Sequence, residues 1–69
     1  MLTGASSMAT TAGILEYAHW LEEIAPGFIA MVVLAETGKD SRDRDLLDQV
    51  TLLIEIFGVV GAAQIVGCP

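Results

Sequence analysis

Acidic side chains at helical spacing are the residues of this chain whose chemistry is easiest to define. Glu16 and His19 form a Glu-x-x-His pair, and Glu23 follows one helical turn later. Carboxylate-bridged two-metal bundles use this spacing together with a glutamate from a facing helix, and Glu55 lies within the second apolar stretch. An antiparallel hairpin would place Glu55 level with Gly27, about 12 Å along the axis from His19. We therefore expect no metal site within one chain, because only contact between chains would bring these four candidate ligands together.

Two long apolar stretches must position these residues, and each is long enough for a membrane-spanning helix. Residues 14–37 and 46–68 are mostly apolar, and the period-two alternation typical of strands is absent. At about 1.5 Å per residue, the apolar residues 14–35 and 46–68 of these helices would rise roughly 33 to 35 Å, which matches a bilayer core of about 30 Å. The charged residues 38–45 are typical of a loop. The predicted fold class is all-α, a two-helix antiparallel hairpin that follows a small-residue arm, residues 1–13.

Local signals indicate where the first helix begins, bends and ends. The side chain of Thr10 or Thr11 can accept a hydrogen bond from the first turn, and Gly38 suits the left-handed position that ends a helix. The Pro26-Gly27 pair removes one helical hydrogen bond between these two ends. We therefore predict that the first helix is kinked or broken at Pro26-Gly27, which gives two half-helices.

Composition favours association and excludes several classes of function. Hydrophobic residues make up 54 % of only 69 residues, and so short a chain buries too little surface to cover them alone, which predicts a homo-oligomer. A net charge of -6 leaves no basic patch, so we expect no direct nucleic-acid binding by the monomer. Cys68 is the single cysteine, which excludes an internal disulfide. No catalytic signature is present, and we predict that the protein is not an enzyme.

One side of each predicted helix combines acidic with small residues. Gly58 and Ala62 have the small-xxx-small spacing that lets helix backbones approach closely in lipid. At 100° per residue, each helix places its acidic and small residues near one another. The predicted helix-contact residues are Glu23, Gly27, Ala30, Glu55, Gly58 and Ala62. At such contacts we expect Glu23 and Glu55 to be buried, and neutral or hydrogen-bonded.

The basic residues predict an orientation in the membrane. All three, Lys39, Arg42 and Arg44, lie in the loop. Cytoplasmic loops are enriched in lysine and arginine, whatever acidic residues accompany them. We therefore predict a membrane protein with a cytoplasmic loop and both termini outside.

The layout of residues 14–68, two hydrophobic helices joined by a loop that carries the basic residues, resembles the small pilins of conjugative and related type IV secretion systems. The resemblance implies a membrane-stored structural subunit that polymerises into a filament and is extracellular after assembly. Its partners would be other copies of itself and membrane lipid, and bound lipid is the one small molecule expected, with no cofactor. Two alternatives remain open. One is an accessory or ion- or proton-handling subunit of a larger membrane complex; the other is a soluble helical oligomer with a Glu/His metal site.

Overall fold

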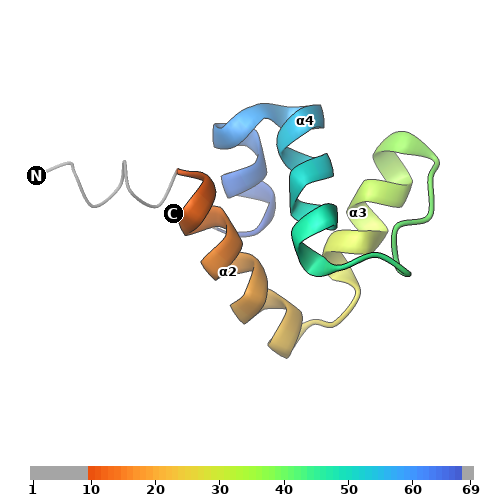
Figure 1. Cartoon of the computed structure of the whole chain (residues 1–69), viewed down its shortest axis with the longest axis horizontal. Helices are drawn as coiled ribbons and strands as arrows, with labels where there is room; N and C mark the ends of the chain where they lie inside the picture. Colours follow the sequence, from red (N-terminus) through yellow and green to blue (C-terminus); the bar gives the residue numbers. More distant parts are fainter. Residues whose placement is uncertain (1–9, 68–69) are drawn as a thin grey trace, which may run out of the picture.

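The described part of the chain, residues 10–67 of a computed structural model, is all-helical and contains no strand. Its helices are α2 (Thr11–Ile24), α3 (Phe28–Thr37) and α4 (Leu46–Ile65), and α4 stands between the other two (Figure 1). The all-α prediction is confirmed, but these residues form three helices instead of a two-helix hairpin. Most of the predicted arm, residues 1–9, lies outside the described residues, as do residue 68, the last of the second predicted helix, and residue 69.

The first predicted helix is divided at the Pro26-Gly27 pair into α2 and α3, which are bent by 111°. Ala25 ends α2 with φ -142° and ψ 71°, and Gly27 precedes α3 with φ 84°, in the left-handed region that favours glycine. The Gly27 N–H donates to Glu22 Oε2 at 3.2 Å, so the carboxylate of Glu22 supports the turn. Departures from helical geometry at Ala25 and Gly27 therefore produce a corner here, where the sequence predicts a kink or break.

The predicted caps of the first helical region are confirmed. Thr10 precedes α2, and its hydroxyl oxygen accepts a hydrogen bond from the Gly13 N–H at 3.3 Å. Gly38 ends α3 in the left-handed conformation with φ 75°, and its N–H donates to the Leu34 carbonyl. These two caps mark the outer ends of the bent pair.

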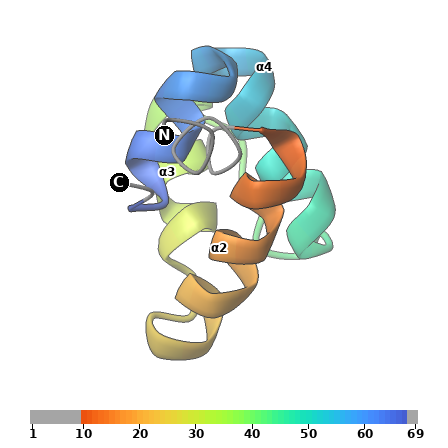
Figure 2. The same ribbon diagram turned by 90° about the vertical axis from the view of Figure 1, so that its left-hand side faces the viewer.

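A second break lies inside α4, where the sequence predicted a straight helix. Gly58 has φ 76° and ψ 174°, a backbone conformation that is essentially restricted to glycine. The ribbon of α4 turns back at this point, and Figure 2 shows the turn above α2, with α3 behind α2. The segment before Gly58 therefore rises only about 18 Å.

One described helix, α4, is long and apolar enough to cross a membrane, and the bent pair of α2 and α3 passes the same test as a broken span. Core helices of soluble proteins have similar lengths and compositions. Mean hydropathy thus permits a membrane location, while the bends at Gly27 and Gly58 give a compact arrangement.

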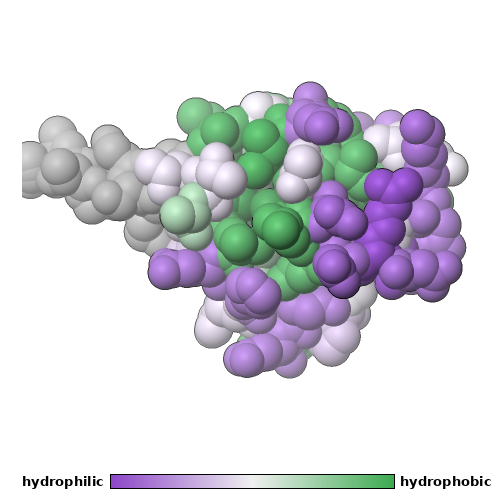
Figure 3. Space-filling model, viewed as in Figure 1, coloured by the Kyte–Doolittle hydropathy of each residue, from purple (hydrophilic) through white to green (hydrophobic). Residues whose placement is uncertain are grey.

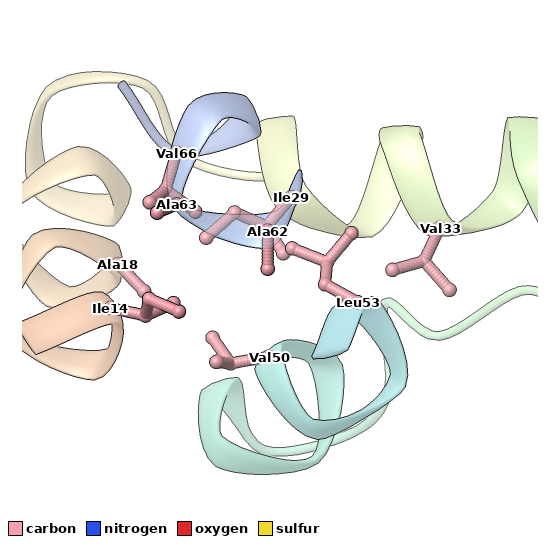
Figure 4. Packing of buried hydrophobic residues seen from close by; sticks show 9 residues of the cluster. All are labelled: Ile14, Ala18, Ile29, Val33, Val50, Leu53, Ala62, Ala63 and Val66. Atoms are coloured by element: carbon pink, nitrogen blue, oxygen red, sulfur yellow. The ribbon is translucent and has the colours of Figure 1, made fainter. Parts of the chain in front are cut away.

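The core lies where α4 packs against both other helices, and its side chains point toward one another (Figure 4). α2 supplies Ile14 and Ala18, and α3 supplies Ile29 and Val33. The remaining members of the cluster come from α4 and the residue after it: Val50, Leu53, Ala62, Ala63 and Val66. Alanine takes up little space, which lets the helices lie close together but limits how much apolar surface the core can bury.

Substitution of Gly58 tests whether its backbone conformation holds the compact fold together. Gly58→Ala should lower the free energy of unfolding by about 1 to 3 kcal/mol, because an alanine at this φ and ψ is strained even though its Cβ meets nothing within 4 Å. Urea unfolding followed by circular dichroism measures the change. Gln64→Ala, at an exposed position of the same helix, is the control and should change stability by less than about 0.5 kcal/mol. Equal stability of the two variants would contradict a structural role for Gly58.

Candidate functional site

The predicted helix-contact residues divide into a buried and an exposed group. Ala30 and Ala62 are buried within the chain, at 1 % and 0 % exposure. Glu23, Glu55 and Gly58 are exposed, and Gly27 is half-buried. The structure therefore brings the two alanines into the core and leaves both carboxylates on the surface; contacts of the exposed group between chains remain a prediction.

Helix rotation explains why Glu55 is not at a contact inside the chain. α4 buries Val50 and Leu53, and Leu53 has 0 % exposure. Two residues correspond to about 200° around a helix, so Glu55 points away from the face that Leu53 buries. The small-xxx-small pair also has a role within one chain, because Gly58 forms the turn and Ala62 fills the core.

The metal-ligand candidates are not brought together in one chain. Glu16, His19, Glu23 and Glu55 are all exposed. Across residues 10–67, no group of three His, Cys, Asp or Glu side chains is arranged to hold a metal ion. A Glu/His metal site formed between chains stays a prediction.

Large apolar side chains project from all three helices into solvent. They are between 38 % and 64 % exposed, and we call them the exposed apolar residues: Trp20, Ile24, Met31, Leu47, Ile56 and Val60. On the face drawn in Figure 3, hydrophobic residues gather over the middle of the molecule, and hydrophilic residues border them on the right and below. The molecule therefore presents apolar surface on the elements that form its core.

An aromatic hollow lies on α2. Tyr17 and Trp20 are in edge-to-face contact, with ring centroids 6.0 Å apart and ring planes 77° apart. Together with Glu16 they line a hollow of about 310 Å³. The sequence alone does not predict this group as a site, although the spacing i, i+1 and i+4 indicates that all three residues lie on one side of a helix.

The loop between α3 and α4 is ordered by hydrogen bonds near its charged residues. Asp40 accepts from both the backbone N–H and the Nε of Arg42, at 3.0 and 3.3 Å. The backbone hydrogen bond, followed by the side-chain one, lowers the pKa of Asp40 below its ordinary value. Lys39 and Arg44 are also exposed.

Two buried polar side chains anchor this loop to the start of α4. Gln49 is 6 % exposed, and its Nε2 donates to the Arg44 carbonyl at 2.9 Å. The Arg44 N–H in turn donates to the carbonyl of Ser41, which is 1 % exposed. Gln49 Oε1 and Ser41 Oγ have no hydrogen-bond partner in the structure. The loop is thus held by few polar contacts, and the backbone of Arg44 is bonded at both its N–H and its carbonyl.

The pKa of Asp40 provides a test of the loop geometry. An NMR titration of the side-chain carboxyl should give a pKa below the ordinary aspartate value, so the contribution of this contact to stability is present above that ordinary value and is lost as the pH falls through the lower, folded-state pKa. Arg42→Gln should return the pKa only part of the way, because the backbone N–H of residue 42 still donates. Arg44→Gln is the matched control and should leave it unchanged. A full return in the first variant, or an equal shift in both, would contradict the described hydrogen bonds.

Comparison with known proteins gives no assignment. The chain matches no protein-family model, no curated protein and no solved structure. Its function is therefore inferred from the surface described above.

Proposed function

We propose that this protein is a small, non-enzymatic helical subunit that assembles with copies of itself at a membrane, in the manner of a pilin-like structural component. The observation that carries the proposal is the set of exposed apolar residues on all three helices. Fully burying a side chain of this size contributes about 1.5 to 3 kcal/mol relative to leaving it in water. The six side chains are 38 % to 64 % exposed, so association with other copies or with lipid would gain the share of this free energy that belongs to their exposed surface.

The membrane part of the proposal depends on the length and flexibility of α4. Its 20 residues would rise about 30 Å as a straight helix, which equals the thickness of a bilayer core. Gly58 can adopt helical as well as left-handed geometry, so insertion would straighten α4 at this residue. In the inserted form the bent pair of α2 and α3 also crosses, as a broken span, so that the loop carrying Lys39, Arg42 and Arg44 is cytoplasmic and both termini are outside.

A second candidate function is ion or proton handling within a larger membrane complex, and the exposure of Glu55 favours it. Glu55 is exposed next to Ile56, which is also exposed. Asp48 is the other charged residue of α4, and most of the remaining residues of this helix are apolar. A carboxylate at membrane depth is costly and generally has a functional partner. Glu55→Gln would retain assembly under both proposals, but would abolish an ion or proton flux only under the second.

Assembly can be tested on the exposed apolar residues. The wild-type protein, in mild detergent, should form particles larger than one chain by light scattering. The double variant Ile24→Gln/Val60→Gln should shift these particles toward monomers, because it removes apolar surface without touching the core. Gln64→Ala, at an exposed polar position one turn after Val60, should assemble like the wild type. A wild-type protein that remains monomeric at all concentrations would overturn the proposal.

Topology can be tested by labelling with a membrane-impermeant thiol reagent in a Cys68→Ser background. Asp43→Cys places a thiol at an exposed loop position, whereas Ser41 would be unsuitable because it is buried. In intact cells the reagent should label Ser6→Cys and leave Asp43→Cys unlabelled until the membrane is permeabilised. Strong labelling of Asp43→Cys in intact cells would contradict a cytoplasmic loop. Release of the wild-type chain by alkaline carbonate would contradict integral insertion.

A further inference from the structure

The aromatic hollow on α2 has the chemistry of a site for an organic cation. The face of an aromatic ring attracts a guanidinium or ammonium group, and a carboxylate beside it adds a charge-assisted hydrogen bond. Trp20 is 53 % exposed, and the carboxylate of Glu16 shares the hollow with Trp20 and Tyr17. The volume of about 310 Å³ lies at the lower end of the range of ligand sites, which fits a single cationic group better than a large ligand.

The loop of the same chain carries a suitable cation on a restrained backbone. Arg42 is paired with Asp40 at 3.3 Å, whereas Lys39 and Arg44 form no ion pair within residues 10–67. The backbone of Arg44 is bonded on both sides, through its N–H to Ser41 and through its carbonyl to Gln49. Its side chain is thus exposed on a restrained backbone, which lowers the entropy lost on binding. A planar guanidinium also stacks on aromatic rings better than the ammonium group of Lys39 does.

The hollow lies on α2, and Arg44 is not among the residues that line it. In Figure 1, α2 forms the left-hand side, and the loop between α3 and α4 lies on the right. A contact between them is therefore made by two copies, with the hollow of one facing the loop of the next. We infer that the hollow formed by Glu16, Tyr17 and Trp20 binds the guanidinium group of Arg44 from a second copy of this chain.

This inference rests on the proposed self-assembly and specifies its geometry. The two surfaces in contact differ, so each added copy leaves one hollow and one Arg44 free at the ends of the assembly. Such head-to-tail contacts generate a ring if the rotation between copies closes, and an open filament if it does not. The exposed apolar residues then add apolar contacts beside the directional contact between Arg44 and the hollow.

The hollow itself can be tested through its own tryptophan. Trp20 is the only tryptophan of the chain, so fluorescence reports on the hollow directly. N-acetyl-arginine amide should change this fluorescence in a saturable way at constant ionic strength, and Glu16→Gln should weaken the binding about tenfold. The test uses the double variant Ile24→Gln/Val60→Gln, so that a bound neighbour does not compete. Saturation by choline-lipid vesicles but not by the arginine amide would assign the hollow to a lipid headgroup and overturn the contact between copies.

The contact between copies can be tested by reversing its charges. Glu16→Arg and Arg44→Glu should each raise the concentration needed for assembly at least about tenfold, and the double variant should restore it. Lys39→Gln is matched to Arg44→Gln in charge change, and only Arg44→Gln should weaken assembly. Circular dichroism confirms the fold of each variant, and all three positions altered are exposed. A wild-type chain that stays monomeric overturns the proposed function; a wild type that assembles no better than Arg44→Gln overturns only this contact.

Discussion

The backbone conformation of two glycines, Gly27 and Gly58, determines the path of the helices in residues 10–67. Both have positive φ, and neither lies at an ordinary helix end. Gly27 turns α3 by 111° away from α2, and Gly58 turns the second part of α4 back from the first. Without these turns the same apolar sequence would form two long straight helices, and the core in which α4 packs between α2 and α3 would not form. The packing of α4 between α2 and α3 depends on both.

The composition of the core follows from this folded path. Because the helices approach closely, the core includes Ala18, Ala62 and Ala63, and its largest side chains are isoleucine and leucine. Trp20, Met31 and the other exposed apolar residues find no space inside. A small core and an apolar surface are therefore two results of one constraint: a short chain rich in hydrophobic residues. Association supplies the burial that the single chain lacks.

The sequence predicts the helical class, the break at Pro26-Gly27 and the caps at Thr10 and Gly38, because each depends on residues close together in the chain. It does not predict the turn at Gly58, since an isolated glycine in an apolar helix is also compatible with helical geometry. The rotation of each helix about its axis is set by tertiary packing, and the burial expected for Glu23 and Glu55 within helix contacts does not occur inside one chain.

The candidate site was likewise only partly predictable. The basic loop was recognised from composition, but the hydrogen bonds that restrain Arg44 come from Gln49 and Ser41, whose burial depends on tertiary packing. The aromatic hollow requires the two rings to adopt an edge-to-face arrangement while Trp20 stays exposed. Neither the ring orientation nor the exposure can be read from residue spacing alone.

Gln49 has a consequence for how this sequence can change over time. Its buried amide uses one nitrogen to bond the loop and leaves its oxygen unbonded, which costs free energy that an apolar residue of similar shape would not. A leucine or methionine here is therefore expected to be tolerated or even stabilising, yet it would remove a polar contact that favours one rotation of α4 about its axis. Selection for stability and selection for a unique conformation would then act on this position in opposite directions. Drift toward apolar residues at Gln49 would indicate that a well-defined loop is no longer needed.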